Sequence, residues 1–311
     1  MLDATDIASS ASPEALLDRI GPRWAEDINA HRDAVQRAYL PLLEAHALPG
    51  LRVTRELAYG PHARQRLDIY QPLAAQQAGA ALPVMVFVHG GAFIRGNKDA
   101  NAQIYANVAR FFARHGFVGV NVEYRLAPEA RFPQGAEDVA LALDWLRSRL
   151  VNYGGDASRL LLIGHSAGGT HVASLLCDPR LQERRPPVAG AVLISARLRA
   201  DVLASNPNAE GVRAYFGADP ARHAQDSPVV HAGHLQVPTL VAVAEHENPW
   251  LDVYAMEFCQ RVGQARGRTP PLLWVPRHNH SSIVAHLDSR GGQEPFGLQL
   301  LDFARGLAPS D

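Results

Sequence analysis

Short runs of apolar residues, each separated from the next by a longer stretch, recur from residue 84 onward. The runs are continuous rather than alternating, which is typical of strands buried on both faces. They are Val84–Val88, Phe117–Val122, Leu160–Ile163, Ala191–Ile194, Leu240–Val243 and Leu272–Val275. Helical stretches among them are about Ala102–His115, Gln134–Leu150, Gly169–Leu176, Trp250–Val262 and Phe296–Leu307. This order predicts an α/β fold with a mostly parallel sheet and helices on both faces.

Three further segments complete the predicted organisation. Leu51–Leu57 and Arg66–Tyr70 have strand character and extend the predicted sheet to eight strands. Residues 13–48 carry an amphipathic helical stripe. The stretch from Arg197 to Val237 is the longest without a sheet strand, and we expect it to lie above the carboxyl edge of the sheet. We expect residues 1–311 to form a single domain.

Charge and composition exclude several classes of function. The chain has 30 basic and 31 acidic residues without a block of like charge, so no nucleic-acid partner is expected. No apolar run approaches the roughly 20 residues that span a bilayer, and the first residues lack the apolar core of a signal peptide. Cys177 and Cys259 are interpreted as free thiols, which favours a cytoplasmic protein.

One serine lies in a setting that suits a nucleophile. Gly164-His165-Ser166-Ala167-Gly168 follows the buried run Leu160–Ile163 and precedes a helical stretch. This G-x-S-x-G pattern is typical of a nucleophile elbow, a sharp turn that needs small flanking residues. The hydroxyl would then stand at a helix N-terminus, where backbone N–H groups favour developing negative charge. The alternative is an ordinary Gly/Ser turn between a strand and a helix.

A second glycine-rich loop follows an earlier strand. His89-Gly90-Gly91-Ala92-Phe93 comes directly after Val84–Val88 and is similar to the oxyanion loop of esterases. The alternative is a glycine-containing loop without chemistry. His89 precedes Ser166 in the chain, so we expect it to brace this loop rather than act as a base.

Candidates for an acid and a base follow the last two strands. Ala244-Glu245-His246-Glu247-Asn248-Pro249 follows one run, and Pro276-Arg277-His278-Asn279-His280-Ser281 follows the next. A serine hydroxyl needs such a base, and the order serine, acid, histidine is the one found on this kind of sheet. Both segments would lie at the same sheet edge as Ser166. The residues alone leave two carboxylates, Glu245 and Glu247, and two imidazoles, His278 and His280.

Longer stretches carry a family resemblance. HGGAFIRG, NVEYRLAPEARFPQGAEDVALALDWL, NYGGDASRLLLIGHSAGG and NHSSIVAHL resemble the hormone-sensitive-lipase-like branch of the α/β-hydrolases. Within that branch the chain is similar to small bacterial carboxylesterases and arylformamidase-like enzymes, over roughly residues 65–305. The resemblance implies the α/β-hydrolase fold with a small helical cap, for which residues 13–48 and 197–230 are the candidates.

The resemblance also implies roles for individual residues. The catalytic residues would be Ser166, Glu247 and His280. The oxyanion hole would be formed by the backbone N–H groups of Gly90, Gly91 and Ala167. Asp138, Asp144, Tyr124, Arg125 and Asp156 match positions that we interpret as structural.

Two departures from the family pattern stand out. Glu247 stands where the family more usually has an aspartate. His165 replaces the aspartate that precedes the serine in lipase-like members and is typical of the arylformamidase-like side. The resemblance therefore leaves the subfamily open.

Aromatic residues are the candidates for a substrate pocket. The predicted lining residues are Phe93, Tyr215, Phe216 and Trp250, with Trp24 and Tyr39 as further candidates. Packing in the core is the alternative for each. A short apolar pocket would favour short acyl chains or aromatic esters.

The predicted function is hydrolysis of small or aromatic carboxylic esters through an acyl-enzyme. The alternative is an arylformamidase or another amidase with the same triad. A non-catalytic ligand receptor is a third reading, against which His280 argues because such receptors lose this histidine. No cofactor is expected, and His231, His234, His246 and His286 lack the spacing of a zinc site. The expected partner is a small-molecule ester or amide, and related enzymes often form homodimers through the eighth strand or the last helix.

Overall fold

The computed structural model describes residues 12–46, 50–73 and 81–310. Its centre is an eight-stranded sheet in the order β1-β2-β4-β3-β5-β6-β7-β8. The strands are β1 Leu51–Ala58, β2 Arg66–Pro72, β3 Leu82–Val88, β4 Val118–Val122, β5 Gly155–His165, β6 Gly190–Ile194, β7 Thr239–His246 and β8 Leu272–Asn279. β2 runs antiparallel to β1 and β4, and the remaining pairs are parallel. The predicted strands and the mostly parallel sheet are confirmed.

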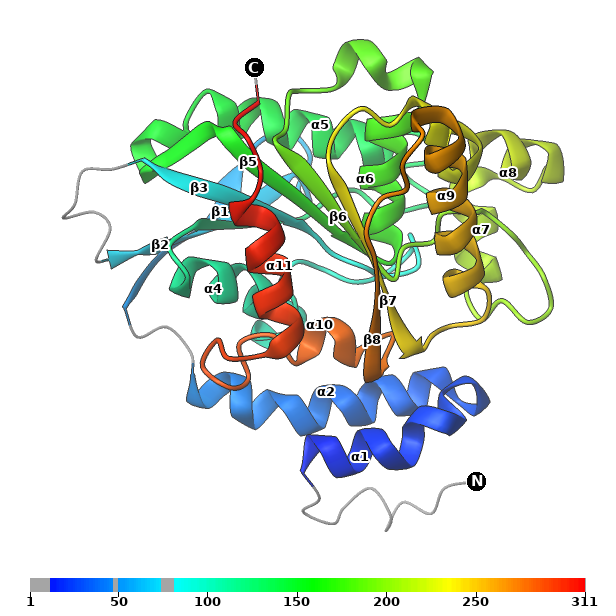
Figure 1. The fold of residues 1–311 in the computed structure, drawn as a ribbon, viewed down its shortest axis with the longest axis horizontal. Helices are drawn as coiled ribbons and strands as arrows, with labels where there is room; N and C mark the ends of the chain where they lie inside the picture. The colour runs from blue at the N-terminus through cyan, green and yellow to red at the C-terminus, as the bar shows by residue number, and fades with distance from the viewer. Residues whose placement is uncertain (1–11, 47–49, 74–80, 311) are drawn as a thin grey trace.

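Helices cover both faces of this sheet (Figure 1). One face packs against α5 (Gln134–Arg147), α6 (Ala167–Cys177) and α9 (Leu251–Arg266). The other packs against α4 (Ala106–Arg114), α10 (Ser282–Ala285) and α11 (Pro295–Arg305). Successive strand residues point to opposite faces, so Val86 and Val88 belong to the first core while Met85 and Phe87 belong to the second. Because both of their faces are buried, the central strands β3 to β7 carry continuous apolar runs.

Two predicted helices are shorter in the structure. The stretch Ala102–His115 becomes a 3-10 turn, η2 (Ala100–Ala102), followed by α4, because Tyr105 has a positive φ of 72° that interrupts the helix. The stretch Gln134–Leu150 ends at Arg147 and is followed by η3 (Leu150–Tyr153). The helical pattern located both helices but not their ends.

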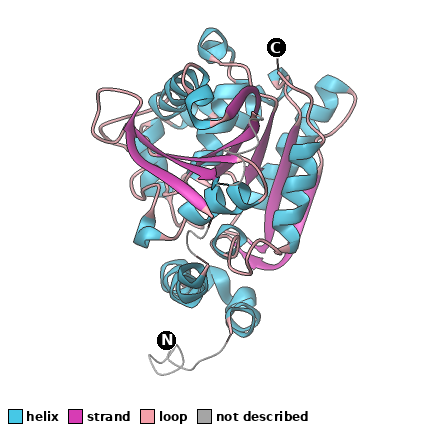
Figure 2. Cartoon of the chain, turned by 90° about the vertical axis from the view of Figure 1, so that its left-hand side faces the viewer, coloured by secondary structure: helices cyan, strands magenta, loops and turns pink. Residues whose placement is uncertain are grey.

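The N-terminal segment forms two helices joined by a 3-10 turn. These are α1 (Pro13–Ile20), η1 (Gly21–Glu26) and α2 (Ile28–Ala45); residues 47–48 of the predicted stretch lie outside the described residues. Ser12 caps α1 by accepting from the Ala15 N–H. In Figure 1 the two helices lie at the bottom of the view, beyond the ends of β7 and β8, and Figure 2 shows them from the side. Contacts of α1 with β8 and of η1 with β7 and β8 hold this segment at the carboxyl edge of the sheet.

The chain between β6 and β7 also lies outside the sheet. It forms α7 (Ala209–Phe216), α8 (Pro220–Asp226) and η5 (Pro228–His234), while η4 (Pro179–Arg184) precedes β6. A Cβ on Gly211 would clash with the Ala92 carbonyl, so α7 packs closely on the loop after β3. Among the helices of the described residues, none is both long and apolar enough to cross a membrane.

Candidate active site

Ser166 occupies a sharp turn between β5 and α6. Its backbone has φ 54° and ψ −118°, a conformation that non-glycine residues rarely adopt. A Cβ on Gly164 would lie 2.6 Å from the Gly168 carbonyl oxygen, and one on Gly168 would clash with the Val88 carbonyl. The two glycines of the G-x-S-x-G pattern therefore permit the close packing of β5, α6 and β3 that holds the serine in place.

Three residues that are far apart in the chain meet at this turn. His280 Nε2 lies 3.0 Å from Ser166 Oγ, and His280 Nδ1 lies 2.8 Å from Glu247 Oε2. Ser166, Glu247 and His280 follow β5, β7 and β8, whose carboxyl ends meet at one edge of the sheet. The arrangement has the geometry in which an imidazole can take the proton of a serine while a carboxylate orients it.

The Glu247 carboxylate is held by several donors. Its Oε1 accepts from the Ala244 N–H at 3.0 Å and from the Ser195 hydroxyl. Its Oε2 accepts from the Asn248 N–H at 3.2 Å as well as from His280. Burial would raise the pKa of Glu247, but the neighbouring His280 and these hydrogen bonds outweigh it and hold the pKa below its usual value. The carboxylate therefore stays ionised beside the imidazole.

The two alternatives left open by the sequence have other contacts. Glu245 Oε2 accepts from the Arg277 N–H at 2.6 Å and is exposed. His278 Nδ1 lies 3.1 Å from Ser282 Oγ, and its ring lies 4.1 Å from the ring of His286. The geometry therefore favours Glu247 and His280 as the predicted acid and base.

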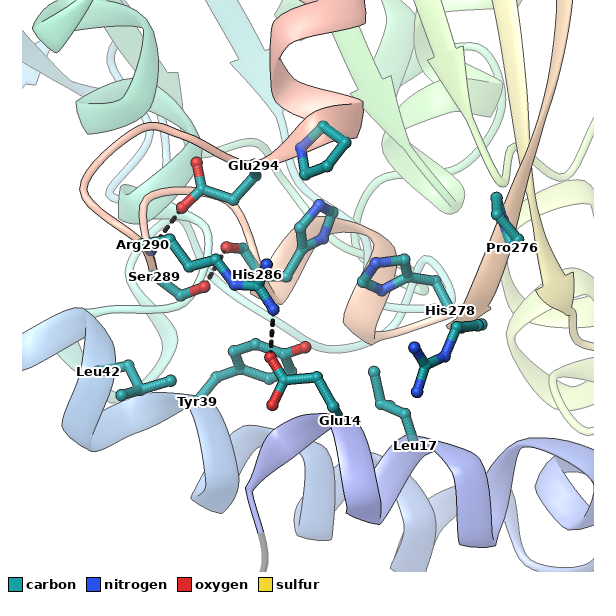
Figure 3. Close-up of a pocket in the computed structure, with 12 residues that line it drawn as sticks. Glu14, Leu17, Tyr39, Leu42, Pro276, His278, His286, Ser289, Arg290 and Glu294 are labelled. Atoms are coloured by element: carbon teal, nitrogen blue, oxygen red, sulfur yellow. Dashed lines mark hydrogen bonds and ion pairs between the residues drawn. The ribbon is translucent and has the colours of Figure 1, made fainter.

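His278 lines a separate cavity of about 160 Å³ between the N-terminal helices and the segment after β8 (Figure 3). Its walls also include Glu14, Tyr39, His286 and Arg290. Burial lowers the pKa of His278 to about 4 and holds that of His286 well below its usual value, so both rings are neutral at pH 7. Within residues 12–46, 50–73 and 81–310, no group of three or more His, Cys, Asp or Glu side chains could hold a metal ion.

The glycine loop after β3 lies against Ser166. A Cβ on Gly90 would lie 3.0 Å from Ser166 Cβ, and one on Gly91 would clash with the Arg95 carbonyl. Ala167 is the first residue of α6. Gly90 and Ala167 therefore lie beside the serine and Gly91 follows in the same loop, while the role of these donors toward an oxyanion stays a prediction.

His89 supports this loop from below. Its Nδ1 lies 2.6 Å from the Gly90 carbonyl oxygen and its Nε2 lies 3.2 Å from Glu123 Oε1. These contacts match a bracing role. Asp138, another residue that we interpreted as structural, binds the Arg125 guanidinium.

His165 connects the turn that carries Ser166 to the segment that carries His280. Its Nε2 lies 3.0 Å from the His280 carbonyl oxygen, so this nitrogen carries the proton and donates. Its Nδ1 has no hydrogen-bond partner in the described part of the chain. Burial holds the pKa of His165 well below its usual value, so the ring is neutral.

Three of the predicted lining residues pack against one another. The rings of Phe93 and Tyr215 stack at 4.8 Å, and Phe216 contacts both edge-on. All three are buried in a cluster that includes Ala167, whereas Trp250 is 45% exposed and stacks on Tyr254. Contact of these residues with a substrate stays a prediction.

Sequence reasoning missed two residues at this site. Ser195 donates to the acid, and its only sequence signal is its position directly after a buried strand. Tyr105 contacts the rings of His89 and His165, but it lies inside a stretch that has the pattern of a helix.

Parts of this chain match known proteins. Residues 67–183 match the BD-FAE family. Esterase LipC of Mycobacterium tuberculosis is 35% identical over 42% of this chain and 32% of its own length. Carboxylesterase NlhH of the same species is 31% identical over 54% of this chain and 51% of its own length. The chain thus spans at most about half of the length of these curated relatives.

Solved structures extend the likeness to nearly the whole chain. Esterase B from Lactobacillus rhamnosis has a TM-score of 0.68 and 21% identity, covering 94% of each chain. The hyperthermophilic esterase from Pyrobaculum calidifontis has a TM-score of 0.70 and 22% identity, covering 94% of this chain and 96% of its own. The chain therefore has the α/β-hydrolase fold of these esterases.

Proposed function

We propose that this chain is a carboxylesterase that cleaves small or aromatic esters through Ser166, His280 and Glu247. The observation that carries the proposal is the pair of contacts at 3.0 Å and 2.8 Å that links the serine, the imidazole and the carboxylate. The names of the relatives, esterases and carboxylesterases, support the same chemistry.

In the first half of the reaction Ser166 Oγ attacks the ester carbonyl carbon. The serine proton passes to His280 Nε2, and the electron pair of the carbonyl bond moves to its oxygen. The N–H groups of Gly90, Gly91 and Ala167 stabilise this oxyanion, and removal of one such donor typically costs about 2.7–4 kcal/mol. The oxyanion then collapses, the bond to the alcohol breaks, and His280 returns its proton to the leaving alcohol.

In the second half water replaces the alcohol. His280 takes a proton from the water as its oxygen attacks the acyl carbon. Collapse of the second oxyanion breaks the bond to Ser166 Oγ, which recovers a proton from His280. Glu247 fixes the imidazole tautomer and stabilises its charged form throughout. The free acid and the restored enzyme are the products.

Cleavage of an N-acyl aromatic amine is the second candidate. It would use the same residues, and His165 favours it because this position carries histidine in the arylformamidase-like enzymes that the chain resembles. The two activities differ in the leaving group, which His280 must protonate as an alcohol or as an amine.

A substrate comparison with one variant tests the proposal. Wild type is expected to hydrolyse p-nitrophenyl butyrate, and Ser166→Ala is expected to lose nearly all of this activity while remaining folded. Ser148→Ala, which changes an exposed serine at the end of α5, is the matched control.

Faster turnover of N-formylkynurenine than of the ester would favour the amidase. Full activity of Ser166→Ala would contradict both, and an inactive wild type that a fluorophosphonate does not label would favour a receptor.

The proposal also covers the cellular location of the protein, its oligomeric state and its cap. Cys177 and Cys259 are unpaired and buried, which suits a reducing cytoplasm. β8 lies at an edge of the sheet and carries Trp274, 49% exposed, which suits pairing of two copies along this strand. Helical elements 13–48 and 197–230 would cap the substrate site. Light scattering of the purified protein tests the dimer.

A further inference from the structure

Tyr105 lies beside the candidate active site in an unusual backbone conformation. Its φ is 72° and its ψ is −33°, immediately before α4 begins at Ala106. Non-glycine residues rarely occupy this region, and they do so most often where position matters for function. The conformation directs the ring between β3 and the serine turn, 5.7 Å from the ring of His89 and 6.0 Å from that of His165.

The phenol oxygen and the Ser166 side chain lie on the side of Gly90 where a side chain would project. A Cβ built on Gly90 would lie 3.2 Å from Tyr105 Oη and 3.0 Å from Ser166 Cβ. The hydroxyl and the serine side chain therefore border the same small space above Gly90. A side chain at residue 90 would fill that space, which is a physical reason for glycine here.

This hydroxyl donates no hydrogen bond to any residue that the structure describes, while its oxygen accepts from the Gly90 N–H. Two other tyrosines near the site contrast with it, because Tyr59 donates to the Glu123 carbonyl and Tyr124 donates to the His89 carbonyl. A largely buried phenol normally has a partner. Tyr105 is only partly buried, and within the described residues its O–H proton has no acceptor.

The charge state of Tyr105 suits a hydrogen-bond donor. Burial raises the pKa of Tyr105 to about 12, although Arg32, Arg95 and the Gly90 N–H act in the opposite direction. The phenol therefore keeps its proton at neutral pH. Because the Gly90 N–H faces the phenol oxygen, a substrate oxygen that accepts from Gly90 would also come within reach of the phenol O–H.

We propose that the Tyr105 hydroxyl is a side-chain member of the oxyanion hole, donating a hydrogen bond to the substrate carbonyl oxygen as negative charge develops there. This inference rests on the proposed esterase function. Tyr105 transfers no proton: the oxyanion accepts its O–H while the serine proton stays on His280. The interaction strengthens as the charge grows, so it acts on the transition state more than on substrate binding.

Tyr105→Phe removes only this hydroxyl. Tyr70→Phe is the matched control, because Tyr70 is a fully buried tyrosine of β2 whose hydroxyl has no partner in the described part of the chain. With p-nitrophenyl butyrate we expect Tyr105→Phe to lower kcat by about 10²-fold with less than a two-fold change in KM. The inhibition constant of butylboronic acid, a transition-state analogue, should rise by a similar factor. Tyr70→Phe should match wild type in both.

Further readouts separate this role from a structural one. The melting temperature and the midpoint of the pH–kcat profile should be unchanged in Tyr105→Phe, because His280 is not displaced. Wild-type kcat in Tyr105→Phe, a loss confined to KM, or a shifted pH midpoint would overturn the inference. A wild type without ester activity would overturn the proposed function instead, and the boronate comparison would still test Tyr105.

Discussion

Two serine–histidine pairs lie at the carboxyl edge of the sheet, and their imidazoles are two residues apart in the chain. Ser166 Oγ lies 3.0 Å from His280 Nε2, and Ser282 Oγ lies 3.1 Å from His278 Nδ1. The distances are almost equal, yet within the described residues only the first pair has a carboxylate as its third partner. Glu247 contacts the far nitrogen of His280, whereas the tilted ring of His286 lies beside His278 (Figure 3).

The hydroxyls of Ser166 and Ser282 also differ in their surroundings. Ser166 stands between a strand and the N-terminus of α6, whereas Ser282 is fully buried and its oxygen accepts from the Asn279 N–H at 2.9 Å. The Ser282 hydroxyl therefore stabilises a turn. A short distance between a serine and a histidine is therefore not sufficient to make the serine a nucleophile. The orienting carboxylate and the sharp turn at Ser166, with its positive φ, distinguish the two pairs.

The largest expected effect comes from exchanging the two imidazoles for amides. His280→Gln should lower kcat for p-nitrophenyl butyrate by about 10⁵–10⁶-fold, because the serine loses its base. His278→Gln should remain within about three-fold of wild type at pH 7. A similar loss in both variants, measured by steady-state kinetics, would contradict the distinction between the pairs.

A smaller effect is expected at the acid. Glu247→Gln keeps the shape of the side chain but removes its charge, so the imidazole loses the group that fixes its tautomer and stabilises its charged form. We expect kcat to fall by about 10⁴-fold. Glu245→Gln is the control, since its carboxylate contacts the Arg277 backbone, and it should keep wild-type kcat. Equal losses would show that the two carboxylates share the role.

The smallest effect concerns stability in acid. Burial, with Arg290 and Arg277, lowers the pKa of His278 from 6.5 to about 4, while Glu14 acts in the opposite direction. The unfolded chain takes up this proton near pH 6.5, so the stabilisation is complete above that pH and is lost as the pH falls toward 4. Between pH 7 and pH 4 the free energy of unfolding of both proteins should fall. The fall should be about 1–3 kcal/mol smaller in His278→Gln than in wild type.

Urea unfolding at several pH values measures this difference. His234→Gln, at an exposed position, is the control and should follow the wild-type curve. Parallel curves for wild type and His278→Gln would show that the buried ring near the cavity does not contribute. The neighbouring His286 titrates in the same direction, so the variant should keep a shallower slope rather than none.

The sequence was most informative where burial determines the pattern. Strands buried on both faces must be continuously apolar, so β3 to β7 could be located, and the glycines around Ser166 predicted a sharp turn. Spacing could not separate His278 from His280, because they flank the last residue of β8 and only the fold determines which one faces the serine. Tyr105 could not be found, since its position depends on one backbone angle inside a helical pattern.

Covalent labelling of Ser166 tests the central claim most directly. Wild type and His278→Gln, treated with a fluorophosphonate and digested, should carry the added mass on the peptide that contains Ser166. His280→Gln and Ser166→Ala should carry almost none. Label on another residue, or equal labelling of Ser166 in His280→Gln, would contradict the claim that His280 makes this serine reactive.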